Sequence, residues 1–311
     1  MLSRILSNTM VYLLSVAKQE YRPLTGVAAG IVRQACKLSD KALLDWRQYR
    51  SITEARMIHV EETFIVPDWP APANIRAVVT TRHGGVSKPP FDSLNVAFHV
   101  GDEASVVVEN RRRLFNSLNA IAPCGPPQWL QQVHGTDVIE AYSEPKKRAQ
   151  IFPEADAVTT THRGLPCVVM TADCLPVFFA SETGTRVAVA HAGWRGLCNG
   201  VLENTLAKFD NPAEVLCWLG PAIGPDAFEV GADVRDAFLG VDPAAAGAFV
   251  PAGQPGKYLA DLYALARQRL TRAGVGMVSG GEHCTWRDAD RFYSFRRENR
   301  TGRMASVIWI A

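Results

Sequence analysis

The sequence has 311 residues, a hydrophobic fraction of 47% and a formal net charge of +2. This length suffices for one large domain or two small ones, and the composition is that of a globular protein. Because the charge is close to neutral, the composition argues against a broad basic surface for nucleic acid. No apolar run reaches the ~18 to 20 residues that a membrane span needs, so no membrane partner is expected.

The cysteines indicate the redox environment. Seven of them are scattered without regular spacing, at positions 36, 124, 167, 174, 198, 217 and 284. An odd number without a repeated spacing argues against a disulfide framework and favours a reducing compartment, so a cytoplasmic protein is expected. No CxxC pair occurs, which argues against a structural zinc knuckle.

The first 56 residues differ in character from the rest of the chain. Residues 10–17 form a short apolar run that resembles a weak signal peptide, but polar residues at 7–9 interrupt the apolar region. A more coherent sequence begins at Met57. We interpret residues 1–56 as an N-terminal extension, either disordered or an artefact of the assigned start site. The alternative is an amphipathic helix that packs on the domain.

In the first half of the chain, apolar and β-branched runs predict strands. One helix is expected over 103–118, with Asp102 as its N-cap. The arginines at 111–113 in this helix are expected to face water. The strands are predicted over residues 75–81, 129–135, 138–142 and 155–159.

The second half alternates strands and helices irregularly. Strands are predicted at 168–170, 187–190, 215–219 and 305–310, helices at 200–209, 232–239 and 259–273, and a loop at 241–256. Neither an internal repeat nor a linker divides residues 57–311. The sequence therefore predicts a single α+β domain of layered, mixed β-sheets flanked by helices.

Three polar clusters each follow an apolar run, and each contains a residue that can bind a metal ion. These residues are His134, Cys174 and His191. One sulfur and two nitrogens form a catalytic type of zinc site, because three protein ligands leave the fourth position open. Asp173 could orient an imidazole from its place beside Cys174. The alternative without metal is a Cys–His couple in which Cys174 is a nucleophile.

The chain resembles the laccase-domain, or multi-copper-polyphenol-oxidase-like, family of purine nucleoside phosphorylases from about residue 76 to its end. The resemblance rests on a series of ordered motifs: Thr80-Thr81-Arg82 with Gly84-Gly85-Val86-Ser87, Ser93-Leu94-Asn95, His99-Val100-Gly101-Asp102, Gln132-Val133-His134-Gly135, Ala172-Asp173-Cys174, His191-Ala192-Gly193-Trp194-Arg195-Gly196, Ile223-Gly224-Pro225, Tyr293-Ser294-Phe295-Arg296-Arg297 and Thr301-Gly302-Arg303.

This resemblance implies a zinc site on His134, Cys174 and His191, with these three residues and Asp173 as the catalytic group. It implies phosphorolysis of adenosine, inosine, guanosine and S-methyl-5′-thioadenosine, with adenosine deamination as a second activity. Phosphate, the co-substrate, needs cationic partners. The expected substrate-binding residues are Arg82, Asn95, Gln132, Arg195, Arg296 and Arg297.

Two alternatives come with the same family. Its older name implies copper and phenol oxidation, but a laccase needs several copper centres, and this chain has only seven histidines. The other alternative is a role in cell-wall editing. The expected partners are small molecules, namely nucleosides and phosphate, and the expected oligomeric state is a monomer or a weak homodimer.

Overall fold

Two β-sheets form the centre of the computed structural model, which describes residues 63–144 and 152–311. In the first sheet, all neighbouring strands are antiparallel. Its strands, in spatial order, are β1 (Phe64–Ile65), β2 (Ile75–Thr80), β13 (Met304–Ile310) and β5 (Cys167–Thr171). The sheet therefore joins the closing strand of the chain to one of its earliest strands.

The second sheet has six strands and is mixed. Its outer pairs, β12 with β8 and β3 with β4, are parallel, whereas the inner pairs are antiparallel. The spatial order is β12 (Met277–Gly280), β8 (Val215–Leu219), β6 (Leu175–Ser181), β7 (Val187–Ala192), β4 (Ala157–Thr160) and β3 (Val138–Glu140).

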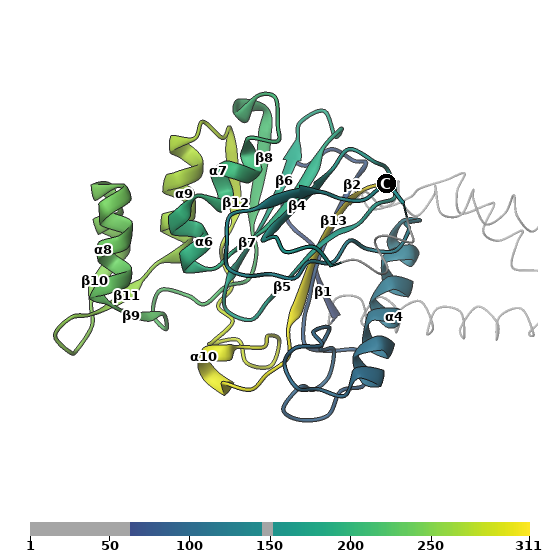
Figure 1. Ribbon diagram of the computed structural model, residues 1–311, viewed down its shortest axis with the longest axis horizontal. Helices are drawn as coiled ribbons and strands as arrows, with labels where there is room; N and C mark the ends of the chain where they lie inside the picture. Colours follow the sequence, from purple (N-terminus) through teal and green to yellow (C-terminus); the bar gives the residue numbers. More distant parts are fainter. Residues whose placement is uncertain (1–62, 145–151) are drawn as a thin grey trace, which may run out of the picture. The chain divides into compact units, whose positions relative to one another are not determined.

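Helices cover the outer faces of the two sheets, as Figure 1 shows. Helix α4 (Ala104–Ile121) packs on the four-stranded sheet through Leu114 and Leu118, and its Val107 is also buried. The helices α6 (Trp194–Asn199), α7 (Val201–Leu206) and α9 (Leu262–Arg272) share a core with the six-stranded sheet. The prediction of an α+β domain with layered, mixed sheets and flanking helices is confirmed.

The core between the two sheets comes from alternating strand residues that face each other. Val79, Val169 and Ile308 belong to one sheet, and Phe178 and Val189 to the other. The Phe178 ring also stacks on Trp218, with 5.7 Å between the ring centroids. Each large apolar side chain buried in this way stabilises the fold by roughly 1.5 to 3 kcal/mol. These contacts fix the two sheets face to face.

The stretch predicted as a loop over 241–256 is partly ordered. It contains a 3₁₀-helix, η2 (Pro243–Ala248), and the strand β10 (Phe249–Pro251). Ala245, Ala248 and Phe249 are buried, which explains the order despite the small side chains. A three-stranded antiparallel sheet joins β10 to β11 (Lys257–Ala260) and β9 (Glu229–Gly231), next to α8 (Ala232–Val241). The remaining short helices are η1 (Pro212–Glu214) and α10 (Phe295–Glu298).

Two expectations about helix α4 are wrong. Its N-cap is Glu103, while the Asp102 carboxylate accepts hydrogen bonds from Ser87 and Asn95 instead of capping. Arg111 does not face water, because its guanidinium lies 3.8 Å from the centroid of the Trp129 ring. Helical spacing places Arg111 on the same stripe as the buried Val107 and Leu114, which explains the difference.

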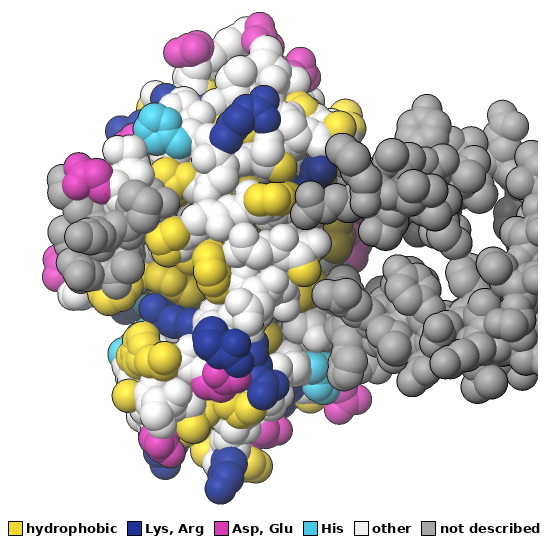
Figure 2. All heavy atoms as spheres, turned by 90° about the vertical axis from the view of Figure 1, so that its right-hand side faces the viewer, with side chains coloured by type: hydrophobic (Ala, Val, Ile, Leu, Met, Phe, Trp, Pro, Cys, Tyr) yellow, Lys and Arg dark blue, Asp and Glu magenta, His cyan; other side chains and the backbone are white. Residues whose placement is uncertain are grey.

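Figure 2 shows the α4 side of the molecule. Over its coloured part, basic, acidic and apolar side chains are interspersed. Within the described ranges, no helix is both long and apolar enough to cross a membrane. Residues 1–56, expected to be an extension, lie outside the described residues.

We predict that a shortened chain beginning at Met57 folds as the full chain does. The composition of residues 1–56 does not match the rest of the chain and the recognisable motifs begin near residue 76, so we expect the core not to depend on that segment. Thermal unfolding followed by circular dichroism measures this. The expected midpoint lies within about 2 to 4 °C of the full chain's, the shift given by roughly 1 kcal/mol in a domain of this size. Failure to fold would show that the first 56 residues pack on the core.

Candidate metal centre

His134, Cys174 and His191 converge in space, although 57 positions separate the first from the last in the sequence. One ligand atom from each residue lies within 4.8 Å of the others. The Cys174 Sγ is 3.8 Å from the His134 Nε2, and the two imidazole rings meet edge to face, with centroids 4.7 Å apart. Among the described residues, this is the single group of three or more potential ligands.

The strand register brings Cys174 and His191 together. His191 lies in β7 opposite Pro176 of β6, and Cys174 ends the turn between β5 and β6. His134 comes from the loop that precedes β3. This loop was predicted to continue a strand over 129–135, but it pairs only through isolated bridges at Gln128 and Gln131.

Asp156 organises the centre, and the sequence analysis did not identify it. Its Oδ1 lies 2.7 Å from the Nδ1 of His191. The same carboxylate accepts hydrogen bonds from the backbone N–H groups of Val133, His134 and Gly135, at 3.1, 3.0 and 2.6 Å. The loop of 129–135 is therefore held by a carboxylate instead of a strand partner. With Nδ1 donating to Asp156, the Nε2 of His191 is left to bind a metal ion.

The sequence contains one local indication of the role of Asp156, namely an aspartate inside an apolar run. The residue stands between Ala155 and Ala157 at the entrance to β4, and all three are fully buried. Because a buried carboxylate needs several hydrogen-bond donors, a lone aspartate inside an apolar run indicates that polar partners come from elsewhere in the chain.

Backbone strain is concentrated at the same place. His134 has a φ of 60° and Asp173 a φ of 90°, in the left-handed region that side chains other than glycine rarely adopt. Such residues cost on the order of 1 to 3 kcal/mol and cluster at functional sites. The Asp173 carboxylate holds its turn by accepting the Thr285 hydroxyl at 2.6 Å and the Arg296 N–H at 2.7 Å.

Gly193 allows the ligands to approach one another. A Cβ atom at this position would lie 2.7 Å from the His134 Cδ2 and 3.1 Å from the Cys174 Sγ. The missing side chain of Gly193 therefore leaves the space that His134 and Cys174 occupy.

The electrostatics favour the ligand form of Cys174. Burial alone would raise the pKa of the thiol, but the charges and hydrogen bonds of His191 and His134 outweigh burial and lower this pKa to about 6. Burial likewise opposes the charge on His191, yet Cys174 and Asp156 raise its pKa to about 9. The metal-free pair thus favours a Cys174 thiolate beside a protonated His191, and a metal ion would take the place of the proton on the His191 Nε2.

This donor set fits a metal ion. Two imidazoles and one thiolate match both three-ligand zinc sites and certain copper sites. The centre is open on one side, because His134 is exposed while His191 is buried. The structure thus brings together the three predicted ligands, with Asp173 next to Cys174.

The expected substrate-binding arginines fall into two groups. Arg82 contacts Asp92 and Glu298, and Arg297 contacts Glu298 and three backbone carbonyls, so both side chains have internal partners. Arg195 and Arg296 are exposed. The Arg195 guanidinium lies over the Trp194 ring, and the Arg296 side chain donates to the Glu229 carbonyl.

The two expected amide residues also have internal partners. Asn95 is fully buried, donates to Ala97 and Asp102, and accepts the backbone N–H of Arg303. Gln132 makes two hydrogen bonds with the backbone of Met170, which tie the His134 loop to the end of β5.

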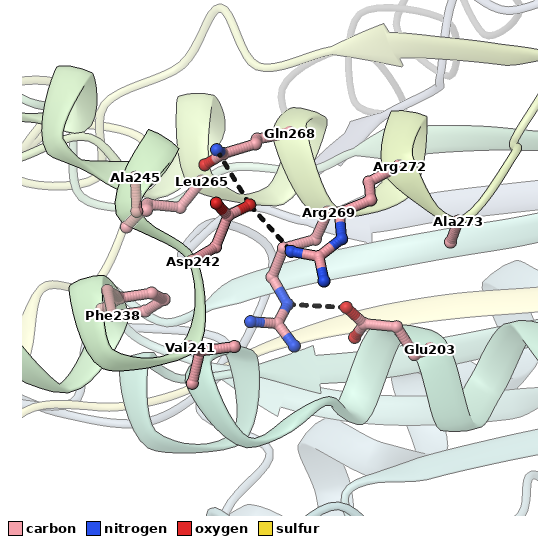
Figure 3. Close-up of a pocket in the computed structure, with 10 residues that line it drawn as sticks. All are labelled: Glu203, Phe238, Val241, Asp242, Ala245, Leu265, Gln268, Arg269, Arg272 and Ala273. Carbon is pink, nitrogen blue, oxygen red and sulfur yellow. Dashed lines mark hydrogen bonds and ion pairs between the residues drawn. The ribbon is translucent and has the colours of Figure 1, made fainter.

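Two cavities lie outside the metal centre. One, of about 190 Å³, is drawn in Figure 3 between α7, α8, η2 and α9. Its arginines are neutralised by carboxylates, Arg269 by Glu203 at 2.8 Å and Arg272 by Asp242 at 2.9 Å. The other, of about 230 Å³, is lined by residues 224–227, 281–284, 286 and 287 together with Tyr263. None of the three metal-ligand residues lines either cavity.

Residues 76–311 match the family model described as multi-copper polyphenol oxidoreductase laccase. The chain therefore belongs to this family.

Its relatives carry a different activity in their names. The chain is 53% identical over 247 residues to purine nucleoside phosphorylase YfiH of Escherichia coli (strain K12), covering 79% of this chain and 98% of the relative. It is 54% identical over 248 residues to purine nucleoside phosphorylase PA4543 of Pseudomonas aeruginosa, with the same coverage.

Solved structures share the fold. Neisseria meningitidis protein NMB0706 is 49% identical, with a TM-score of 0.74 over 80% of this chain and 99% of that one. YlmD from Geobacillus stearothermophilus is 33% identical, with a TM-score of 0.73 over 80% and 96%.

We predict that Asp156→Asn weakens metal binding about 10- to 100-fold, the range found when partners of metal-bound histidines are changed. An amide cannot accept hydrogen bonds at both of its ends, so either His191 or the His134 loop loses its partner. Competition with a chelator measures the affinity.

The matched control is Asp137→Asn, the same change at an exposed position. It should leave the affinity unaltered. Equal affinities in wild type and Asp156→Asn would contradict the role given to this carboxylate.

Proposed function

We propose that this protein is a zinc-dependent purine nucleoside phosphorylase. The observation that carries the proposal is the three-ligand centre of His134, Cys174 and His191 with its exposed side. Support comes from relatives named purine nucleoside phosphorylase, nearly all of whose length the chain covers at about half identity.

The proposed reaction joins phosphate to the ribose as the purine leaves. A phosphate oxygen forms a bond to the anomeric carbon while the bond from that carbon to the purine nitrogen breaks. The bonding electrons leave with the purine, and the proton of hydrogen phosphate ends on a purine nitrogen. Inosine and hydrogen phosphate thus give hypoxanthine and ribose 1-phosphate.

The zinc ion, when bound, would supply a Lewis acid with an open coordination position. Asp156 fixes the tautomer and orientation of His191. Asp173 anchors the strained turn that presents Cys174, because its carboxylate binds Thr285 and the start of α10. Arg195 belongs to the motif that begins with His191, and the backbone N–H of Arg296 donates to Asp173. Both arginine side chains are exposed and are proposed to contact substrate.

Arg82, Asn95, Gln132 and Arg297 are proposed to shape the substrate site through their internal contacts. Gln132, for example, fixes the His134 loop against β5. A substitution of any of these four residues would shift the neighbouring backbone and would thereby weaken substrate binding indirectly.

The copper alternative has less support. Two histidines and one cysteine can bind copper, but a multi-copper oxidase needs further centres. The described residues contain one group of potential ligands. Oxidation of a phenol that depends on added copper would favour that alternative, and activity on cell-wall fragments would favour the cell-wall role.

The substrate range is the finer part of the proposal. Adenosine, guanosine and S-methyl-5′-thioadenosine are proposed as substrates beside inosine, together with a deaminase activity on adenosine. Ammonia release from adenosine without phosphate tests the deaminase activity separately from phosphorolysis. A cytoplasmic location and a monomer or weak homodimer remain predictions.

We predict that the zinc-loaded protein releases hypoxanthine from inosine only when phosphate is present, and that Cys174→Ala loses both metal and activity. Cys174→Ser should retain less metal than wild type, because a hydroxyl is a poor zinc ligand at neutral pH. Metal analysis and product chromatography on the same samples measure both effects.

The matched control is Cys124→Ala, which removes a thiol outside the group of ligands and should keep metal and turnover. Full metal content in an inactive Cys174→Ala would instead make Cys174 a nucleophile. Phosphate-independent release of hypoxanthine would contradict phosphorolysis.

A further inference from the structure

Arg111 and Arg303 are partly buried, and neither contacts a carboxylate among the described residues. The Arg303 guanidinium donates to the carbonyls of Thr301 and Gly302 through one nitrogen and lies 5.7 Å from the Phe295 ring centroid. Arg111 donates to the Val96 carbonyl and lies between the rings of Trp129 and Phe98. Both differ in this respect from Arg82 and Arg297, which contact carboxylates.

The strand register places Arg303 beside the metal centre. Met304 of β13 pairs with Thr171 of β5, so Arg303 stands opposite the start of the turn that leads to Asp173 and Cys174. The negative charges of Cys174 and Asp173 reach Arg303, although burial has the larger effect on its pKa and lowers it.

Residues 95–99 connect the two arginines. The Arg303 N–H donates to the Asn95 side chain at 3.0 Å, and the Val96 N–H donates to the Arg303 carbonyl at 3.4 Å. The carbonyl of Val96 in turn accepts from the Arg111 guanidinium at 2.8 Å. His99 follows in this segment, and burial, Arg303 and Arg111 all lower its pKa.

An arrangement of this kind is costly without an anion. Burying a cation without a counter-charge is unfavourable, and burial lowers the pKa of Arg111 to about 10. The group still carries its charge at neutral pH. An arginine held by carbonyls and rings keeps N–H groups for a ligand, and its planar fork suits phosphate oxygens.

We propose that Arg303 binds the phosphate co-substrate beside the metal centre, with Arg111 as a second positive charge. This assignment rests on the proposed phosphorylase function. It gives Asn95 a positioning role, since its side chain accepts the Arg303 N–H and donates to Asp102. It also explains why Arg82 and Arg297, already paired, are not needed as phosphate ligands.

The test is steady-state kinetics of the zinc-loaded Arg303→Gln protein with phosphate and inosine varied separately. Loss of charge-assisted hydrogen bonds to phosphate should raise the KM for phosphate about 10- to 100-fold. The KM for inosine and the zinc content should stay at the wild-type values. Arg303→Lys keeps the charge but loses the fork, so its KM for phosphate should lie between the two.

The matched control is Arg300→Gln, which removes an exposed arginine of the same loop that donates to the Gly101 carbonyl. It should behave as wild type. An unchanged phosphate KM in Arg303→Gln, or a change confined to inosine, would overturn the assignment.

Titration calorimetry with inorganic phosphate separates this proposal from the phosphorylase proposal. If wild type and Arg300→Gln bind phosphate and Arg303→Gln does not, the assignment holds even without turnover. If wild type turns over inosine with phosphate while Arg303→Gln binds phosphate equally well, the assignment fails and the phosphorylase remains. If wild type neither binds phosphate nor releases hypoxanthine from inosine with phosphate, both fail.

Discussion

The site depends above all on the buried carboxylate of Asp156. It accepts one hydrogen bond from the imidazole of His191 and three from the backbone of the His134 loop. Its own backbone carbonyl accepts the His191 N–H at 2.7 Å. One residue thus fixes two of the candidate metal ligands, which come from different parts of the chain. A fully buried carboxylate is tolerated because its donors replace the water that it loses.

The turn at Cys174 is fixed by a second carboxylate, that of Asp173. Its contacts with Thr285 and the start of α10 join the centre to the C-terminal segment, which also carries Arg303. Strain at His134 and Asp173 is therefore offset by hydrogen bonds to side chains far away in the sequence. The arginines differ in their partners: Arg82 and Arg297 contact carboxylates, whereas Arg111 and Arg303 contact backbone carbonyls and aromatic rings.

Local patterns in the sequence predicted the layered α+β fold and indicated His134, Cys174 and His191 as candidate ligands, with a Cys–His couple as the alternative. Each ligand follows an apolar run, and the strand register then brings the runs together. Asp156 was not predicted because its partners lie 21 to 35 positions away, and no local pattern shows them. The strand expected over 129–135 is wrong for the same reason. Arg111 was expected in water because of its charge, although its helical spacing matched the buried stripe.

X-ray absorption spectroscopy at the zinc edge tests the central claim most directly, because it reports the ligand atoms of the bound ion. For the zinc-loaded protein, the spectrum should show two nitrogen neighbours at about 2.0 to 2.1 Å, one sulfur at about 2.3 Å and one further light atom. This set corresponds to His134, His191 and Cys174 with one position left open. A spectrum without sulfur, or with several sulfurs, would contradict the centre described for this protein.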